Sequence, residues 1–198
     1  MAFKGTLDEE TLAPEEIQVF AELPAVEERL SSSAPHAAYR ALKRSLDFLC
    51  SALAILCLLP VFAVIAAAIK LDDPGPALYV STRIGKNGKP FKMYKFRSMC
   101  MDADAQLAKL AKLNERDGPV FKIKDDPRVT KVGRFIRKTC IDELPQLFNI
   151  LKGDMSIVGP RPPLPTEVAQ YTPYQRQRLN ATPGLTATGR CKGQRHHF

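Results

Sequence analysis

The apolar run Phe48–Ile69 constrains this chain more than any other segment, because Ser51 is the only polar side chain inside it. At about 22 residues, the run is long enough to cross a lipid bilayer as one helix. Pro60 lies in its middle, where a proline removes a backbone hydrogen bond and bends a helix. Basic residues flank the run on both sides: Arg40, Lys43 and Arg44 before it and Lys70 after it.

Two topologies are compatible with this pattern. Helices that span membranes also contain proline, so a single transmembrane helix is one interpretation. The other is a re-entrant helix that breaks at Pro60 and leaves the membrane through the face by which it entered. The positive-inside rule favours the re-entrant form, because that form places both basic flanks in the cytoplasm. The physics of these residues alone leaves both topologies open.

The net charge of +8 is unevenly distributed along the chain. Residues 1–30 contain eight acidic and two basic side chains, so the rest of the chain is strongly basic. A basic body indicates an anionic partner such as a phosphate-bearing substrate, an acidic lipid or a nucleic acid. No nucleic-acid-binding motif occurs and a long apolar run fits such a protein poorly, so we expect no nucleic-acid partner.

The five cysteines, at positions 50, 57, 100, 140 and 191, are odd in number and show no Cys-x-x-Cys spacing. The three histidines form no metal-ligand pattern with them. This usage argues against a disulfide framework or a zinc site and fits a reducing cytoplasm.

The sequence after the apolar run predicts a small mixed body. Gly85–Gly88 separates two strand-like segments, 77–82 and 91–97, which is a hairpin signal. Alternation along the second strand places Lys95 and Arg97 on one side, where they either converge on one anion or form a solvated basic edge. Further expected elements are an amphipathic helix over 102–114, a strand over 120–124 and a polar helix over 167–182.

Asp142 and Glu143 are adjacent carboxylates between a basic run and an apolar helical pattern. The basic run is Arg134, Arg137 and Lys138, and the apolar pattern is Leu144, Leu147, Phe148 and Leu151. Pro145 is tolerated only near the start of a helix, so we expect the two acids in or beside the N-terminal cap. The helix dipole there would keep Asp142 ionised, and a phosphate could share the same N–H donors. An acidic helix cap without a catalytic role is the alternative.

Arg161 lies between Pro160 and Pro162, which restrict the backbone on both sides of it. Such a loop presents the guanidinium in a nearly fixed position, suited to two-pronged recognition of a phosphate or carboxylate. The alternative is a proline-rich docking segment.

Several longer motifs occur in a fixed order along the chain. They are Lys43-Arg44-Ser45-Leu46-Asp47, Asp73-Pro74-Gly75-Pro76, Tyr94-Lys95-Phe96-Arg97-Ser98-Met99, Thr139-Cys140-Ile141-Asp142-Glu143-Leu144-Pro145-Gln146 and Gly153-Asp154-Met155-Ser156-Ile157-Val158-Gly159-Pro160-Arg161-Pro162. With these motifs, the region from Tyr39 to Thr186 resembles the monotopic phosphoglycosyl transferases, also called the bacterial sugar transferases. The resemblance implies an α+β body on a re-entrant membrane helix broken at Pro60, with amphipathic helices at its surface.

The resemblance also implies an activity. Such enzymes transfer a sugar-1-phosphate from a UDP-sugar to polyprenyl (undecaprenyl) phosphate and release UMP, the first step of exopolysaccharide, capsule or O-antigen synthesis. Implied as well are a Mg²⁺ cofactor, contact with membrane lipids, and a location at the bacterial inner membrane with the catalytic body on the cytoplasmic face. The oligomeric state stays open, with a homodimer as one option.

Individual residues match family positions. Asp142 matches the nucleophile that would form a covalent phospho-Asp intermediate, and Glu143 matches its partner; both are candidate Mg²⁺ ligands. Lys95, Arg137 and Arg161 match basic positions that bind phosphate or nucleotide. Arg97 joins them as a candidate substrate-binding residue from the strand alternation.

We interpret the chain as four segments: an acidic arm and linker (1–36), the re-entrant helix (37–71), the catalytic domain (72–186) and an atypical tail (187–198). Family chains continue after Thr186 into a segment with Trp-Gln, whereas this sequence contains no tryptophan. Codons for Ala187–Cys191 read two bases on can encode Tyr-Trp-Gln-Val, which makes a frameshift one explanation of the tail. The alternative function is a truncated, non-catalytic membrane-anchored protein that binds nucleotide or lipid.

Overall fold

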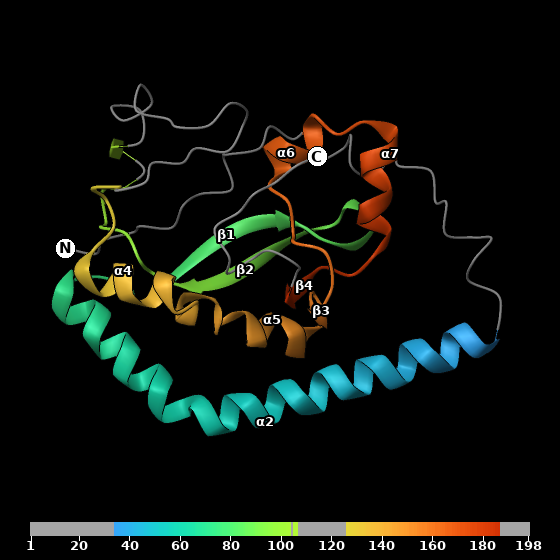
Figure 1. Ribbon diagram of the computed structural model, residues 1–198, viewed down its shortest axis with the longest axis horizontal. Coiled ribbons are helices and arrows are strands. Elements are labelled where there is room, and N and C mark those ends of the chain that lie inside the picture. The colour runs from blue at the N-terminus through green and yellow to red at the C-terminus, as the bar shows by residue number, and fades with distance from the viewer. Residues whose placement is uncertain (1–33, 104, 107–125, 187–198) are drawn as a thin grey trace, which may run out of the picture.

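A single long helix runs beneath the rest of the molecule in the computed structural model, which describes residues 34–103, 105–106 and 126–186 (Figure 1). This helix, α2, spans Ala34–Asp72 and contains the whole apolar run. It continues through Pro60 as one helix and is bent near its middle, as expected for an internal proline. By length and composition, the helix is apolar enough to cross a membrane. Helix α2 begins three residues before residue 37, where the sequence predicted the membrane segment to start.

The predicted hairpin is confirmed. Strand β1, Leu78–Ile84, pairs antiparallel with β2, Pro90–Phe96, so that Tyr79 lies opposite Lys95. The connection contains the short 3₁₀ helix η3, Lys86–Gly88, in which Asn87 adopts a left-handed conformation with φ 56°. Asparagine tolerates this region better than most residues, which explains the hairpin signal in the sequence.

Two short helices separate the hairpin from α2 and form the middle of three layers (Figure 1). Helix α4 spans Lys131–Lys138 and begins at Thr130, whose hydroxyl accepts a hydrogen bond from Gly133 N at 2.9 Å. Helix α5 spans Gln146–Lys152 and ends at Gly153, which has φ 97° as a left-handed C-terminal glycine.

A second, two-stranded sheet lies beside α5. Strand β3, Ser156–Val158, pairs in parallel with β4, Gly184–Thr186. The pairing requires a close backbone approach, because a Cβ on Gly184 would lie 2.0 Å from Gly159 N. Residues 184–186 therefore belong to the folded body.

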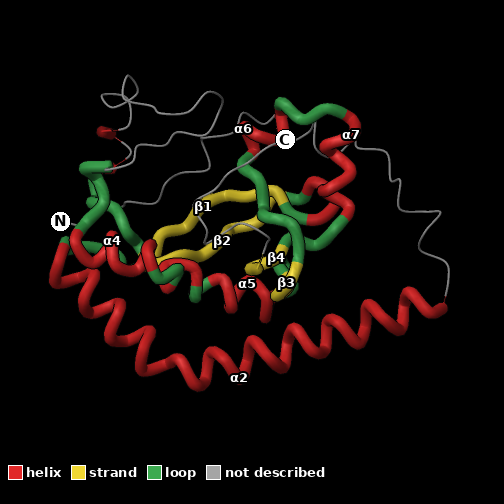
Figure 2. The backbone as a smooth tube through the Cα atoms, in the orientation of Figure 1, coloured by secondary structure: helices red, strands yellow, loops and turns green. Residues whose placement is uncertain are grey.

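The polar helix expected over 167–182 is wrong as a single element. The structure contains α6 (Pro165–Ala169), α7 (Pro173–Arg176) and the 3₁₀ helix η6 (Gln177–Asn180), with the loop before α7 visible in Figure 2. Thr172 starts α7 by accepting a hydrogen bond from Gln175 N at 3.3 Å. Pro173 follows it at the first helical position, where its missing N–H costs nothing.

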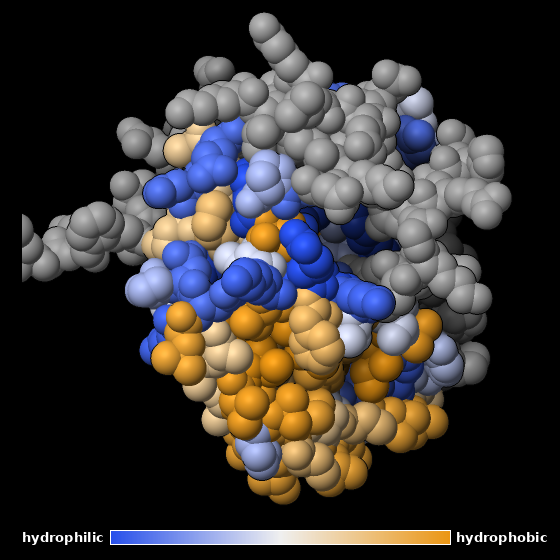
Figure 3. Space-filling view, turned by 60° about the vertical axis from the view of Figure 1, so that its left-hand side comes forward, coloured by the Kyte–Doolittle hydropathy of each residue, from blue (hydrophilic) through white to orange (hydrophobic). Residues whose placement is uncertain are grey.

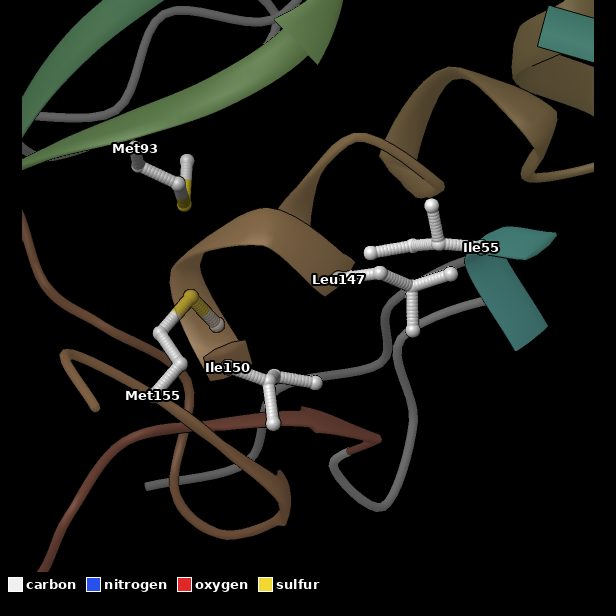
Figure 4. Packing of buried hydrophobic residues seen from close by; sticks show 5 residues of the cluster. All are labelled: Ile55, Met93, Leu147, Ile150 and Met155. Atoms are coloured by element: carbon white, nitrogen blue, oxygen red, sulfur yellow. The ribbon is translucent and has the colours of Figure 1, made fainter. Parts of the chain in front are cut away.

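The core lies where α2, α5 and β2 meet. Its buried members are Ile55, Met93, Leu147, Ile150 and Met155, which Figure 4 shows facing one another across these elements. A second cluster of Ile69, Phe96 and Ile136 joins the other end of α2 to α4. The apolar face of α5 is rotated from the expected one. Ile150 is fully buried, whereas Phe148 is 40% exposed and contacts the Phe62 ring of α2 at a tilted angle.

The outward face of α2 is apolar and exposed. Its exposed large side chains include Leu46, Leu49, Leu53, Leu56, Leu59 and Val64. Figure 3 shows the apolar surface gathered at the α2 end of the molecule, with hydrophilic side chains in a band above it. Such a contiguous apolar face is typical of a surface that contacts lipid or protein rather than water.

The expected α+β body with one long membrane-compatible helix is confirmed. The re-entrant course of that helix stays a prediction. Most of the predicted helix over 102–114, the strand over 120–124, the acidic arm and the tail lie outside the described residues.

Candidate active site

The two acids lie on a turn between α4 and α5. Asp142 and Glu143 belong to the 3₁₀ helix η5, Ile141–Glu143, and α5 begins three residues later behind Pro145. The expectation that they sit close to the start of this helix is thus right. They lie beside the cap and do not form it, because Pro145 occupies the cap position and makes no side-chain cap hydrogen bond.

Cys140 shapes the entry to this turn. Its backbone is left-handed, with φ 58° and ψ 16°, which is uncommon for a residue with a side chain. Residues in such sparsely populated conformations cluster at functional sites, since the surrounding structure must hold them there. Cys140 is also disulfide-bonded, whereas Cys50, Cys57 and Cys100 are free. The sequence argued against a disulfide framework, and the bonded Cys140 departs from that expectation.

Lys95 lies on the hairpin and contacts one acid of the pair Asp142 and Glu143, called the dyad from here on. Its Nζ lies 3.0 Å from Oε1 of Glu143, and both side chains are mostly buried. The contact joins residues 48 positions apart, so it depends on the packing of β2 against η5 and α5. A basic side chain thereby lies beside the pair of acids, as the resemblance implied.

Burial raises the pKa of Asp142 above its usual value. Lys95 and Arg137 lower this pKa and Glu143 raises it, but the two cations do not outweigh burial. The pKa is thus raised rather than lowered as a helix cap would lower it, because desolvation is the largest influence on this carboxyl. A hydrogen bond from its own backbone N–H also lowers this pKa, so Asp142 is held by a local backbone donor, while Lys95 and Arg137 act on it through charge.

Arg137 is held beside Asp142 by Ser98. The Nε of Arg137 donates a hydrogen bond to Ser98 Oγ at 2.7 Å. The two segments approach closely because α4 carries Gly133 at the contact, where a Cβ would lie 2.0 Å from Ser98 O. Sequence reasoning missed Ser98 as a site residue, since nothing local distinguishes this serine from any other after a strand.

Arg97 does not join Lys95 at the dyad. Strand β2 ends at Phe96, so Arg97 leaves the alternation that placed the two cations together. Its Nη1 lies 3.0 Å from Asp73 Oδ2, and its Nη2 also donates to the Asp73 backbone carbonyl. Asp73 further accepts a hydrogen bond from Met101 N at 3.1 Å. Arg97 therefore supports the turn that follows α2.

Arg161 lies in a separate group near α6. Its Nη1 lies 3.1 Å from Oε1 of Glu167, which also accepts a hydrogen bond from Leu164 N at 2.8 Å through Oε2. Burial is the largest influence on the Tyr171 hydroxyl and raises its pKa, whereas the charges of Arg178 and Arg161 lower this pKa. A small cavity is lined by Arg161, Arg178 and the hairpin end at Ile84 and Gly85. The structure thus brings Asp142, Glu143, Lys95 and Arg137 together, and places Arg97 and Arg161 elsewhere.

The dyad fits a magnesium ion of the substrate-bound kind. Mg²⁺ prefers oxygen ligands and is often bound by one or two carboxylates together with substrate phosphates. Asp142 and Glu143 supply two adjacent carboxylates with that chemistry. Within the described residues, no group of three or more His, Cys, Asp or Glu side chains could form a complete protein cage for a metal. An ion here would therefore complete its shell with phosphate and water.

A sequence model of the bacterial sugar transferases matches residues 38–198, most of the chain. The chain belongs to the bacterial sugar transferase family. The resemblance carried by the sequence motifs is thereby confirmed. The match begins near the described start of α2 and extends through the segment set apart above as a tail.

Three relatives from this family illustrate the match. Galactosyl transferase CpsE of Streptococcus agalactiae is 50% identical over 122 residues, covering 62% of this chain and 27% of that protein. Undecaprenyl-phosphate galactose phosphotransferase of Salmonella typhimurium is 42% identical over 173 residues, covering 84% of this chain and 36% of that protein. Exopolysaccharide production protein ExoY of Sinorhizobium fredii is 42% identical over 156 residues, covering 77% and 69%. The chain thus spans about a third of the two larger relatives and about two thirds of ExoY.

Proposed function

We propose that this chain is a phosphoglycosyl transferase. It transfers a sugar-1-phosphate from a UDP-sugar to undecaprenyl phosphate, giving undecaprenyl-diphosphate-sugar and UMP. This reaction would begin the synthesis of a bacterial surface glycan such as exopolysaccharide, capsule or O-antigen. The printed names of the relatives support the reaction class, since one is an undecaprenyl-phosphate galactose phosphotransferase and another an exopolysaccharide production protein.

The observation that carries the proposal is the contrast between Asp142 and its neighbours. Lys95 and Arg137 bring positive charge to the turn, yet Glu143 takes the ion pair with Lys95. The Asp142 carboxylate therefore lies near two cations whose own hydrogen bonds go to Glu143 and Ser98. A half-buried carboxylate with a raised pKa beside two cations is a typical catalytic arrangement.

The reaction proceeds by two displacements at one phosphorus. A carboxylate oxygen of Asp142 attacks the phosphorus that bears the sugar; the bond to the bridging oxygen breaks, and UMP leaves with the electron pair. The product is an acyl phosphate, the mixed anhydride of the Asp142 carboxyl with the sugar-1-phosphate. An oxygen of undecaprenyl phosphate then attacks the same phosphorus, forming the new diphosphate and releasing the carboxylate. Covalent catalysis of this kind divides one difficult step into two easier ones.

The remaining groups of the site neutralise the negative charge of the reacting phosphates. Lys95 and Arg137 offset the negative charge of the donor diphosphate as it enters a site that already holds two acids. When bound by Asp142, Glu143 and substrate phosphates, Mg²⁺ would supply further charge neutralisation on the diphosphate. Arg161, near its own cavity, is proposed to bind the nucleotide portion of the donor.

The direct test is UMP release from UDP-sugars by the detergent-solubilised chain, with undecaprenyl phosphate and Mg²⁺ present. Asp142→Asn should abolish release and Asp102→Asn, which changes an exposed carboxylate, should not. If the chain binds nucleotide or lipid but never releases UMP, it is the non-catalytic membrane-anchored protein that forms the alternative.

We further propose that α2 is re-entrant, so that the catalytic body lies on the cytoplasmic face of the inner membrane. Contacts on both sides of Pro60 support this topology. Arg44 donates to Ile150 O and Leu151 O before Pro60, and Asp72 accepts from Val132 N at 2.9 Å after it. A helix that crossed the bilayer would separate its two ends by about 30 Å of hydrocarbon, out of reach of one small body.

Thiol labelling tests the topology. Tyr39→Cys and Leu71→Cys introduce exposed thiols near the two ends of α2 in a background without native cysteines. A membrane-impermeant maleimide should label both positions only after spheroplasts are permeabilised. Labelling of one position in intact spheroplasts would show that α2 spans the membrane.

A further inference from the structure

The amide of Asn149 completes the free edge of the hairpin. Strand β2 pairs with β1 along one edge. On its other edge, Tyr94 N donates to Asn149 Oδ1 at 3.0 Å, and Asn149 Nδ2 donates to Lys92 O at 2.7 Å. The side-chain amide thus occupies the place that a peptide group of a third strand would take. We call these two hydrogen bonds the edge amide pair.

The edge amide pair connects the two elements that carry the dyad and its lysine. Asn149 lies on α5 and is fully buried, while η5 precedes α5 directly in the chain. Lys95 follows Tyr94 on β2, and its Nζ contacts Glu143 of η5. Polar connections between β2 and the segment 141–152 therefore include the buried edge amide pair, the ion pair at the dyad and an exposed hydrogen bond from Lys152 Nζ to the Tyr94 hydroxyl at 2.6 Å.

The edge amide pair determines both the distance between α5 and β2 and the register of β2 along α5. Asn149 must meet an N–H and a C=O that point away from β1, and residues 92 and 94 provide them. Because side chains alternate along a strand, a slip by one residue would turn Lys95 to the opposite face of β2. An ion pair alone tolerates such movement, since a lysine side chain is long and flexible.

Asp154 and the end of α5 orient the amide. Asn149 Nδ2 lies 3.3 Å from Asp154 Oδ2, which identifies the donor end of the side chain. The backbone carbonyl of Asn149 accepts hydrogen bonds from the N–H groups of Gly153, Asp154 and Met155. Asparagine is the residue that fits here, because aspartate lacks the donor for Lys92 O and serine is too short to reach both groups.

We infer that Asn149 is a positioning residue for the transfer reaction, and that it acts by holding Lys95 opposite the dyad in the correct register. It touches neither substrate nor the reacting atoms. This inference rests on the proposed function for its kinetic consequence, but its geometric content is independent of turnover.

A double-mutant cycle separates positioning from general stability. Asn149→Ser should lower kcat/KM for UMP release by roughly 30- to 100-fold, since a misplacement of about 1 Å can cost about 100-fold. In a Lys95→Met background, the same change should lower it by less than about 3-fold, because the residue through which Asn149 acts is already gone. Ser156→Ala, a change at another buried polar residue, should have the same small effect in both backgrounds. Equal losses for Asn149→Ser in both backgrounds would overturn the inference.

A measurement without turnover keeps the inference testable if the chain proves inactive or if one variant folds poorly. Lys95→Cys and Glu143→Cys, in a background with no other cysteine, place two thiols that dibromobimane bridges with a gain of fluorescence. Asn149→Ser, and the milder Asp154→Ala, should slow this bridging, whereas Ser156→Ala should not. Unchanged bridging after Asn149→Ser would contradict the inference, while absent UMP release with slowed bridging would contradict only the proposed function.

Discussion

Asp47 and Asp142 are two aspartates of this chain with basic neighbours and opposite electrostatic states. Asp47, on α2, is buried and receives hydrogen bonds from Lys43 Nζ at 2.5 Å, Ser156 Oγ at 2.7 Å and Ile157 N at 3.3 Å. Burial works to raise its pKa, but these hydrogen bonds outweigh burial and leave the pKa lowered. At Asp142, burial prevails and the pKa is raised.

The difference lies in direct contact rather than in the amount of nearby charge. Lys43 and Ser156 bind the oxygens of Asp47, and Lys43 also donates to Ser156 at 2.6 Å, so this group is a closed network that joins α2 to β3. Lys95 and Arg137 act on Asp142 from positions where their own hydrogen bonds go to Glu143 and Ser98. A carboxylate bound by side chains from two elements stabilises the fold, whereas Asp142, held only by its own backbone N–H among the influences on its pKa, is available for a substrate.

The comparison predicts its largest effect at Asp142. Asp142→Asn should lower UMP release by at least about 1,000-fold, because an amide cannot act as the nucleophile. The thermal midpoint of unfolding should stay equal or rise, since ionised Asp142 is disfavoured by burial in the folded state. Comparison of turnover and thermal midpoint for the variant and the native chain checks both points. A folded variant that retains more than a tenth of the activity would contradict the assignment.

At Asp47, by contrast, we expect a substitution to lower the stability of the fold. Asp47→Ala removes the acceptor for Lys43, Ser156 and Ile157, and should lower the free energy of unfolding by about 3 kcal/mol, at the low end for a buried pair because Lys43 is partly exposed. Denaturant unfolding in detergent measures this loss. Asp102→Ala, at an exposed carboxylate, should change the stability by less than about 0.5 kcal/mol. Equal stability of the two variants would show that the Asp47 network contributes nothing.

The pH dependence should separate the two aspartates. The folded pKa of Asp142 is raised, so the nucleophile is protonated, and activity lost, at a higher pH than an ordinary aspartate would require. The folded pKa of Asp47 is lowered, so its stabilisation is present above the unfolded value and is lost only as pH falls through the lower folded pKa. Activity should therefore decline at a pH where the fold persists.

Lys95→Met should sharpen this separation. Removal of a cation that lowers the pKa of Asp142 should move the acidic limb of the activity profile to higher pH. Profiles of kcat/KM for Lys95→Met, with Lys95→Arg as the charge-preserving control, test the shift. A limb that moves to lower pH would mean that another group controls it.

The smallest effect is expected at Ser156. Ser156→Ala removes a hydroxyl that bridges Lys43 and Asp47, and should lower the free energy of unfolding by about 1–2 kcal/mol. Activity per folded molecule should not change, because the network lies apart from η5 and β2. Loss of activity at full stability would show that the two regions are coupled.

Local signals in the sequence predicted the local parts of the fold. The apolar run predicted a long helix, and Gly85–Gly88 predicted the hairpin, because helix length and turn chemistry are determined within a few residues. Pro145 correctly placed the dyad beside the start of α5, where Pro145 itself takes the cap position. Alternation failed for Arg97 because the strand ended one residue earlier.

Contacts between distant segments were predicted only where the family resemblance supplied them. The resemblance placed Lys95 and Arg137 near the dyad. It did not predict the networks of Asn149 or Asp47, whose partners lie 55 to 57 and 109 to 110 positions away. Asp47 occurs in a basic helix segment and Asn149 in an apolar one, so neither has a local pattern that indicates its partner.

Direct detection of the covalent intermediate tests the account most closely. The chain is incubated with a UDP-sugar and Mg²⁺ without undecaprenyl phosphate, quenched, and digested for peptide mass spectrometry. The account predicts a sugar-phosphoryl mass increase on Asp142 that disappears when undecaprenyl phosphate is added. An adduct on a different residue, or UMP release dependent on the lipid with no adduct at any time, would contradict it.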